Sequence, residues 1–251
     1  MEFQAEMKYV LDTIWLLISG AFVMWMAAGF AMLEAGLVRS KNTTAILTKN
    51  ITLYSVACIA FYLVGYNLMY GEGNALMGSG FALSGTSSES HSLLSDFFFQ
   101  VVFVATAASI VSGTLAERIR FRPFLAFTLV LTAFIYPIQG HWSWGGAALG
   151  GLMDGFSDFA GSTIAHSVGG WLALAGAILL GAQKGKYGPD GKVNAIPGSN
   201  LPLTTLGTFI LWLGWFGFNG GSQLALDRRV TPTLYQLFLP TRTLPHVPEQ
   251  W

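Results

Sequence analysis

Glu34, Glu117 and His166 are ionisable side chains that lie within or at the ends of long apolar segments of this sequence. His166 follows Asp158 by eight residues, and no lysine or arginine is near it in the sequence. Because an apolar setting penalises the charged imidazolium, we expect a neutral imidazole. Ionisable groups inside a membrane tend to be functional. On the residues alone, a pore histidine and a buried packing histidine are both open interpretations.

The two glutamates favour a structural interpretation. Glu34 lies five residues before Arg39, and Glu117 is adjacent to Arg118, both at the ends of apolar segments. Carboxylates and guanidinium groups at such positions commonly reach the membrane interface and pair locally. We therefore expect interfacial ion pairs here and no chemistry.

Aromatic side chains form a second candidate group, with Phe99, Phe103, Trp144 and Phe218 near one end of their apolar segments. An interfacial aromatic belt explains them simply. A cation site is the alternative, because aromatic faces attract cations and the Ser222 hydroxyl can accept a hydrogen bond. Ammonium has N–H donors whereas potassium has none, so a ring face combined with a hydroxyl acceptor could distinguish the two ions.

The composition is that of a membrane protein. Of the 251 residues, 53% are hydrophobic and 10% are charged, and the mean hydropathy is +0.53. Soluble domains carry roughly a quarter charged residues. The formal net charge of zero argues against nucleic acid as a partner. No nucleophile motif or metal-ligand cluster accompanies Asp158 and His166, so we predict neither an enzyme nor a bound cofactor or metal.

The hydropathy pattern predicts six membrane spans and one orientation. The loops after the first, third and fifth spans hold nine lysines and arginines, whereas the N-terminus and the loops after the second and fourth hold one. This asymmetry places the N-terminus outside. The Gly-rich segment 140–161 is too apolar for a solvated loop, and we expect it to dip into the protein. The predicted spans are 11–36, 46–70, 94–116, 123–140, 163–182 and 201–226.

Four motifs, each at the end of an apolar segment, resemble the ammonium transporter and Rhesus-protein family. They are GFAMLEAGLVRSKNT at 29–43, GTLAERIRF at 113–121, DFAGSTIAH at 158–166 and GWFGFNGGS at 214–222. The resemblance extends from about residue 10 to residue 226. It implies an all-α polytopic bundle of eleven spans, of which this chain holds the first inverted repeat of five spans and the sixth span. It also implies a homotrimer with one pore per subunit, in a plasma membrane or a bacterial inner membrane.

The resemblance assigns roles to the aromatic residues. Phe103, Trp144 and Ser222 correspond to the outer site that recruits ammonium, or methylammonium as its analogue. Phe103 and Phe218 correspond to the stacked pair that closes the pore. Asp158 corresponds to the acid that orients the recruitment site without contacting the substrate.

His166 matches the first of two pore histidines, and the implied mechanism is transport. Ammonium loses a proton after recruitment, and neutral ammonia then crosses a hydrophobic lumen. The second histidine and spans seven to eleven are absent from this sequence, so we expect the chain alone to be inactive. The open alternatives are an ammonium sensor of the same fold and a Rhesus-type neutral gas channel. A cytoplasmic regulator is a possible partner.

Residues 227–251 differ from the preceding sequence in composition and in the placement of their basic residues. They hold four of the nine prolines, and their three arginines would lie outside, against the charge asymmetry of the loops. Permitted codons for residues 231–251, read from the third base of each codon, can encode AYAISTIFANTNLAACAGAV. That string resembles the seventh span of the family. We therefore expect a membrane domain over 1–226, followed by a frameshifted tail without a stable fold of its own.

Overall fold

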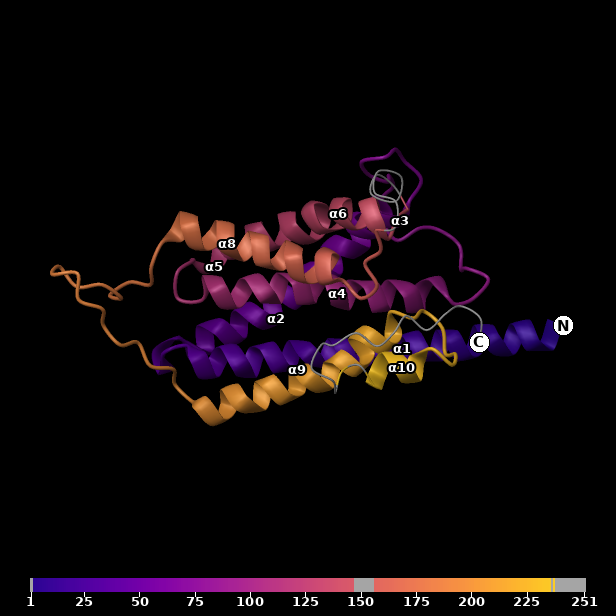
Figure 1. The fold of residues 1–251 in the computed structure, drawn as a ribbon. Coiled ribbons are helices and arrows are strands. Elements are labelled where there is room, and N and C mark those ends of the chain that lie inside the picture. The colour runs from indigo at the N-terminus through magenta and orange to yellow at the C-terminus, as the bar shows by residue number, and fades with distance from the viewer. Residues whose placement is uncertain (1, 147–155, 236, 238–251) are drawn as a thin grey trace.

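The computed structural model describes residues 2–146, 156–235 and 237, and these form helices joined by loops (Figure 1). Two pairs of helices continue into one another through five-residue π-helical turns, and a six-residue π-helical turn begins the helical segment Ser162–Leu180. The elements are α1 (Glu2–Leu37), η1 (Ser40–Asn42), α2 (Thr43–Ala60), η2 (Phe61–Gly65), α3 (Tyr66–Tyr70), α4 (Leu93–Leu115), α5 (Phe121–Val130), η3 (Leu131–Ile135), α6 (Tyr136–Ser143), η4 (Ser162–Ser167), α8 (Val168–Leu180), α9 (Leu201–Gly221) and α10 (Val230–Tyr235).

Six helical segments among the described residues are long and apolar enough to cross a membrane, as predicted. The first begins at Glu2, nine residues before the predicted start, because residues 2–10 are mostly good helix formers. The last ends at Gly221 instead of residue 226, because the two glycines at 220 and 221, just before the C-cap Ser222, favour the end of a helix. The six segments are Glu2–Leu37, Ser40–Tyr70, Leu93–Leu115, Phe121–Ser143, Ser162–Leu180 and Leu201–Gly221.

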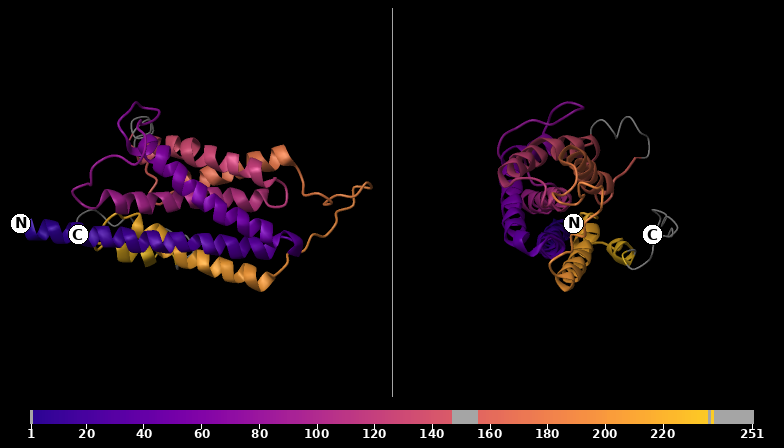
Figure 2. Two further views of the ribbon diagram at one scale, coloured as in Figure 1. Left: turned by 180° about the vertical axis from the view of Figure 1, so that it is seen from behind. Right: turned by 90° about the vertical axis from the view of Figure 1, so that its left-hand side faces the viewer.

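α4 is the most buried helix of the bundle, and α1 and α9 pack side by side along their length (Figure 2). The close approach of α1 and α9 depends on glycine. A Cβ atom at Gly207 would collide with the backbone of Leu33 and Gly29. Small residues at such contacts allow membrane helices to approach closely. This pairing places the end of α9, which carries Phe218, against α4.

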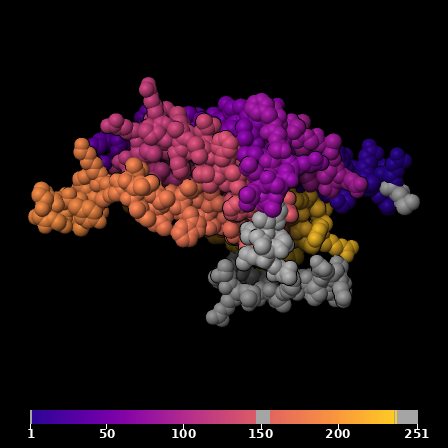
Figure 3. All heavy atoms as spheres, turned by 90° about the horizontal axis from the view of Figure 1, so that it is seen from above, coloured from indigo at the N-terminus to yellow at the C-terminus, as the bar shows by residue number. Residues whose placement is uncertain are grey.

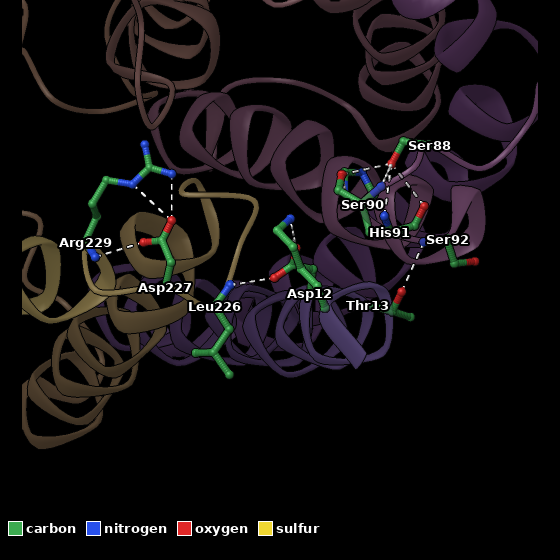
Figure 4. Close-up of polar contacts among 10 residues, drawn as sticks. Asp12, Thr13, Ser88, Ser90, His91, Ser92, Leu226, Asp227 and Arg229 are labelled. Carbon is green, nitrogen blue, oxygen red and sulfur yellow. Dashed lines mark hydrogen bonds and ion pairs between the residues drawn. The ribbon is translucent and has the colours of Figure 1, made fainter. Parts of the chain in front are cut away.

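The end of the bundle that holds the N-terminus is called here the outer end, and Figure 4 shows how α1 ties two other segments together there. Asp12 is buried, and its Oδ1 accepts a hydrogen bond of 2.8 Å from the backbone N–H of Leu226. The next residue, Thr13, accepts from the backbone N–H of Ser92, at 3.1 Å, just before α4. The outer half of α1 therefore fixes the start of α4 and the turn after α9.

At the opposite, inner end, the expected local pairing of the two glutamates is wrong. Glu34 is only 2% exposed and accepts hydrogen bonds from Ser112 Oγ at 2.9 Å and Asn50 Nδ2 at 3.1 Å. Residues five apart do not face each other on a helix, and α1 ends before Arg39. Arg39 instead pairs with Glu117, with 3.0 Å between Nε and Oε2.

The first residues after 226 pack on the bundle. The short helix α10 packs against α9 and buries Val230. The start of the tail is therefore held by contacts with the membrane domain. Residues 238–251 lie outside the described residues, and the absence of a stable fold in the tail stays a prediction. The same holds for residues 147–155 of the segment that we expect to dip into the protein.

Candidate functional site

Phe103 and Phe218, the expected gate pair, are stacked. Their ring centroids are 4.0 Å apart, with 25° between the ring planes, and both side chains are almost fully buried. Phe103 comes from the middle of α4 and Phe218 from the outer third of α9. Two rings in face-to-face contact leave no room for an ion between them.

Trp144, which belongs to the segment 140–161, contacts one ring of this pair. Its ring meets that of Phe103 edge to face, at a centroid distance of 6.0 Å. The indole Nε1–H donates to the backbone oxygen of Asp158 at 2.5 Å, which fixes the orientation of the ring. Phe99 lies on the other side of Phe103, at 4.8 Å. The four aromatic residues singled out from the sequence therefore form one cluster.

Asp158 is buried, and its carboxylate is fully occupied by the backbone. Oδ1 accepts from the N–H groups of Gly161 and Ser162, and Oδ2 accepts from those of Thr163 and Ile164, at 2.8–2.9 Å. The first N–H groups of a helix have no partner within it, and an acidic side chain at this end satisfies them. Asp158 thus organises the start of η4, and its carboxylate oxygens are not free to bind a substrate.

His166 lies within η4, next to Phe218. Its ring meets Phe218 edge to face at 5.4 Å and stacks on Trp215 at 5.9 Å, with 19° between the planes. Nδ1 is 3.2 Å from the backbone oxygen of Gly161. A carbonyl oxygen only accepts, so Nδ1 is the donor, and among the described residues Nε2 has no hydrogen-bond partner.

Ser222 is the member of the predicted site that the structure joins least directly to the others. Its hydroxyl donates to the backbone oxygen of Phe218 at 2.7 Å, and not to Trp144. This bond leaves the hydroxyl lone pairs available as acceptors. Ser222 lies at the C-cap of α9, one helical turn beyond the gate ring.

Sequence reasoning missed Trp215, which stacks on His166. The signal was present, because Trp215 precedes Phe218 by three residues and residues three apart share a helix face. It also missed the buried contacts of Glu34, which join α1 to α2 and α4. Pairs so far apart in the sequence leave no local pattern.

The ring contacts join Trp144, Phe103, Phe218 and His166 in one continuous series. Comparison with known proteins identifies the family of the chain. The sequence matches the Ammonium Transporter Family over residues 14–240. The chain belongs to this family. The match extends past residue 226, where we placed the end of the resemblance. Membership, together with six candidate spans among the described residues, makes this a multi-pass membrane protein.

Two curated relatives define how much of a family member is present. Ammonium transporter Amt2 of Archaeoglobus fulgidus is 48% identical over 224 residues, which cover 85% of this chain and 48% of that protein. Ammonium transporter 3 of Dictyostelium discoideum is 38% identical over 230 residues, which cover 90% of this chain and 52% of that protein. The chain spans about half the length of the curated relatives it matches.

Solved structures confirm the fold. One described as Sensor Amt Protein superposes with a TM-score of 0.85 at 39% identity, covering 93% of this chain and 59% of the other. The crystal structure of Candida albicans Mep2 superposes with a TM-score of 0.78 at 27% identity, covering 90% of this chain and 51% of the other. The predicted all-α bundle of the ammonium transporter fold is therefore correct.

Proposed function

We propose that this chain supplies the outer site and the first half of a pore for ammonium transport. The observation that carries the proposal is the continuous series of ring contacts from Trp144 through Phe103 and Phe218 to His166. It begins beside the outer segment 140–161 and reaches an imidazole that faces aromatic rings. A path with these groups can first hold a cation and then carry a neutral molecule.

Recruitment would take place on the outer side of the gate, between Trp144, Phe103 and Ser222. Ring faces attract a cation that has shed its water, and an acceptor hydroxyl selects a cation that can donate hydrogen bonds. Ammonium meets both conditions and potassium meets only one. Asp158 has a positioning role, because it builds the turn whose backbone holds both the Trp144 indole and the His166 ring.

Beyond the gate, ammonia would travel without its proton. A bare cation in an apolar lumen is costly, whereas the neutral molecule is not. The free Nε2 lone pair of His166 can accept a hydrogen bond from an ammonia N–H, and the Gly161 carbonyl fixes that tautomer. Such a contact guides ammonia along the lumen without trapping a charge there.

Removing individual recruitment groups should weaken uptake at low ammonium. A chimera joining residues 1–226 to the part of Archaeoglobus fulgidus Amt2 that this chain does not match provides the assay. Loss of one cation–π partner is worth roughly 0.5–2 kcal/mol, so Trp144→Leu should raise the apparent Kd several-fold. Ser222→Ala should act in the same direction.

The chain offers a matched control for the serine variant. Ser55 on α2 makes the same bond to the carbonyl four residues earlier that Ser222 makes. Ser55→Ala should leave the uptake curve unchanged. If Trp144→Leu and Ser222→Ala curves overlay the parent's, the recruitment role is wrong.

Alone, the chain should not transport. We infer that a second half, with a second pore histidine, encloses the lumen, and that the whole protein is a homotrimer with its N-terminus outside. In support, α8 and α9 leave large apolar side chains exposed, among them Leu179, Ile178 and Phe209. Vesicles containing the purified chain should show no more ammonium flux than empty vesicles, and a specific flux would refute the half-pore proposal.

A sensor is the second candidate function, because a similar solved structure is described as a sensor. The same outer site would then report ammonium to a signalling partner, such as a cytoplasmic regulator. An ammonium-dependent response without methylammonium uptake would favour it. A Rhesus-type gas channel, the remaining alternative, has less need of a cation site, and the paired rings of Trp144 and Phe103 favour ammonium recruitment.

The residues after 226 give a prediction at the level of the gene. We propose that an insertion or deletion near codon 227 shifted the reading frame, because the alternative frame can encode a small-residue apolar span. DNA sequencing across this codon should reveal a second frame that continues into further spans. If neither of the other frames does so, the tail is a genuine part of this protein.

A further inference from the structure

A cavity of about 550 Å³ opens at the inner end of the bundle, away from the transport path. The segments that line it are the turn between α1 and α2, the first turns of α2, the turn between α4 and α5, and the loop after α8. Figure 1 shows these turns at the same end, at the left. Six basic residues and one acidic residue, Glu117, line the cavity; the basic residues are Arg39, Lys41, Lys49, Arg118, Arg120 and Lys184.

Two of the six basic side chains, Arg39 and Lys49, already have partners. Glu117 pairs with Arg39; burial raises the pKa of this carboxyl, but hydrogen bonds from Asn42 and Arg39 outweigh burial and leave the pKa below its ordinary value. Glu117 is therefore charged at neutral pH. Lys49 is buried, and its Nζ donates to the Ser112 backbone oxygen at 3.4 Å and lies 4.3 Å from the centroid of the Phe124 ring.

The other four charges have no carboxylate partner among the described residues. Lys41, Arg120 and Lys184 are exposed at the mouth of the cavity. Arg118 is partly buried and donates from Nη1 to the Gly181 oxygen, at 3.1 Å, which holds the end of α8. The cavity therefore carries an unbalanced positive charge contributed by three separate loops.

Arg118 supplies an independent observation. Its Nε–H is buried and has no acceptor among the described residues. An unpaired buried donor is costly, the more so on a charged group. Because Arg118 also lines the cavity, its guanidinium is placed to contact a bound anion.

Basic residues are common in inner loops of membrane proteins, and that tendency accounts for their number. This tendency does not explain why basic residues from three loops line the same cavity, or why the buried Nε–H of Arg118 has no partner among the described residues. Apart from Asn42 and Thr48, the remaining lining is apolar and includes Ala45, Ile46 and Phe121. A charged rim above an apolar wall suits an amphipathic anion better than a small polar one.

We propose that this cavity binds a phosphate group, carried by an anionic phospholipid of the inner leaflet or present as free phosphate. Arginine is the side chain best matched to phosphate, because its planar guanidinium donates two parallel hydrogen bonds. Two arginines and two lysines surround the place where the group would bind. The phosphate would tie together the turns that end α1, α4 and α8.

Binding to the purified 251-residue chain in detergent tests the proposal. Three probes separate the sources: dioctanoyl phosphatidylglycerol, inorganic phosphate, and dioctanoylglycerol, which has the same acyl chains without phosphate. The double variant Arg118→Gln/Arg120→Gln should weaken phosphate-dependent binding about tenfold or more. Lys41→Gln/Lys184→Gln, which changes only exposed residues, should weaken it in the same direction and covers the case in which the arginine variant misfolds.

Arg122→Gln is the matched control, because Arg122 is exposed two residues from Arg120 and does not line the cavity. It should leave binding unchanged within about twofold. Binding of the lipid alone identifies a headgroup site, and binding of inorganic phosphate identifies a free-phosphate site. Failure of both phosphate probes, equal binding of dioctanoylglycerol, or an equal loss in Arg122→Gln would overturn the proposal.

Discussion

Replacing His166 with alanine is expected to abolish ammonium uptake, or to uncouple it from selectivity, while the bundle stays folded. The substitution removes the only imidazole that contacts the Phe218 gate ring among the described residues, together with its free Nε2 acceptor. The structural cost is small, since His166 is only half-buried and one lost ring stack is worth about 0.5–1.5 kcal/mol. Methylammonium uptake by the chimera, alongside its melting temperature, separates transport from folding.

His91→Ala provides the comparison, because His91 belongs to the outer loop and contacts none of the gate rings. This variant should transport like the parent. Wild-type uptake and selectivity in a folded His166→Ala chimera would show that the histidine is a packing residue, the alternative that the sequence left open.

Asp158→Asn should both destabilise the protein and stop transport. The amide Nδ2 of asparagine would face two backbone N–H donors where Oδ1 or Oδ2 now accepts. Two lost bonds to a charged acceptor, at about 1.5 kcal/mol or more each, predict a loss of about 3 kcal/mol. The turn that would shift holds the Trp144 indole and the His166 ring, so uptake should fall with stability.

Thermal unfolding and uptake measured on the same preparation test this coupling. Asp190→Asn is the control, because Asp190 is exposed in the loop after α8 and also accepts from a backbone N–H. Figure 3 shows this loop projecting beyond the bundle. Unchanged stability in Asp158→Asn would mean that the four hydrogen bonds do not hold the turn.

Hydropathy was sufficient to predict the spans, because membrane helices must bury their backbone bonds along an apolar length. It was less successful at helix ends: the polar residues before Leu11 continue α1, and the glycines at 220–221 end α9 early. Apolarity says where a helix can cross a membrane, whereas propensity and capping decide where it begins and ends.

The candidate site was predictable where a motif carries it and not where distant segments meet. The motif at 158–166 led to Asp158 and His166, whereas the stacking of Trp215 on His166 depends on how α9 packs against η4. Likewise, Arg39 pairs with Glu117, 78 residues away, in preference to its neighbour in sequence. Periodicity reports which residues share one helix face and contains no information about the partner helix.

Ammonium flux through the chimera is the most direct test of the central claim, that residues 1–226 carry the recruitment site and gate of an ammonium pathway. In vesicles, the folded chimera should give a saturable ammonium flux that an equal concentration of potassium does not reduce. Two results would contradict the account. A folded chimera could give no flux above that of empty vesicles, or its ammonium flux could fall when an equal concentration of potassium is added.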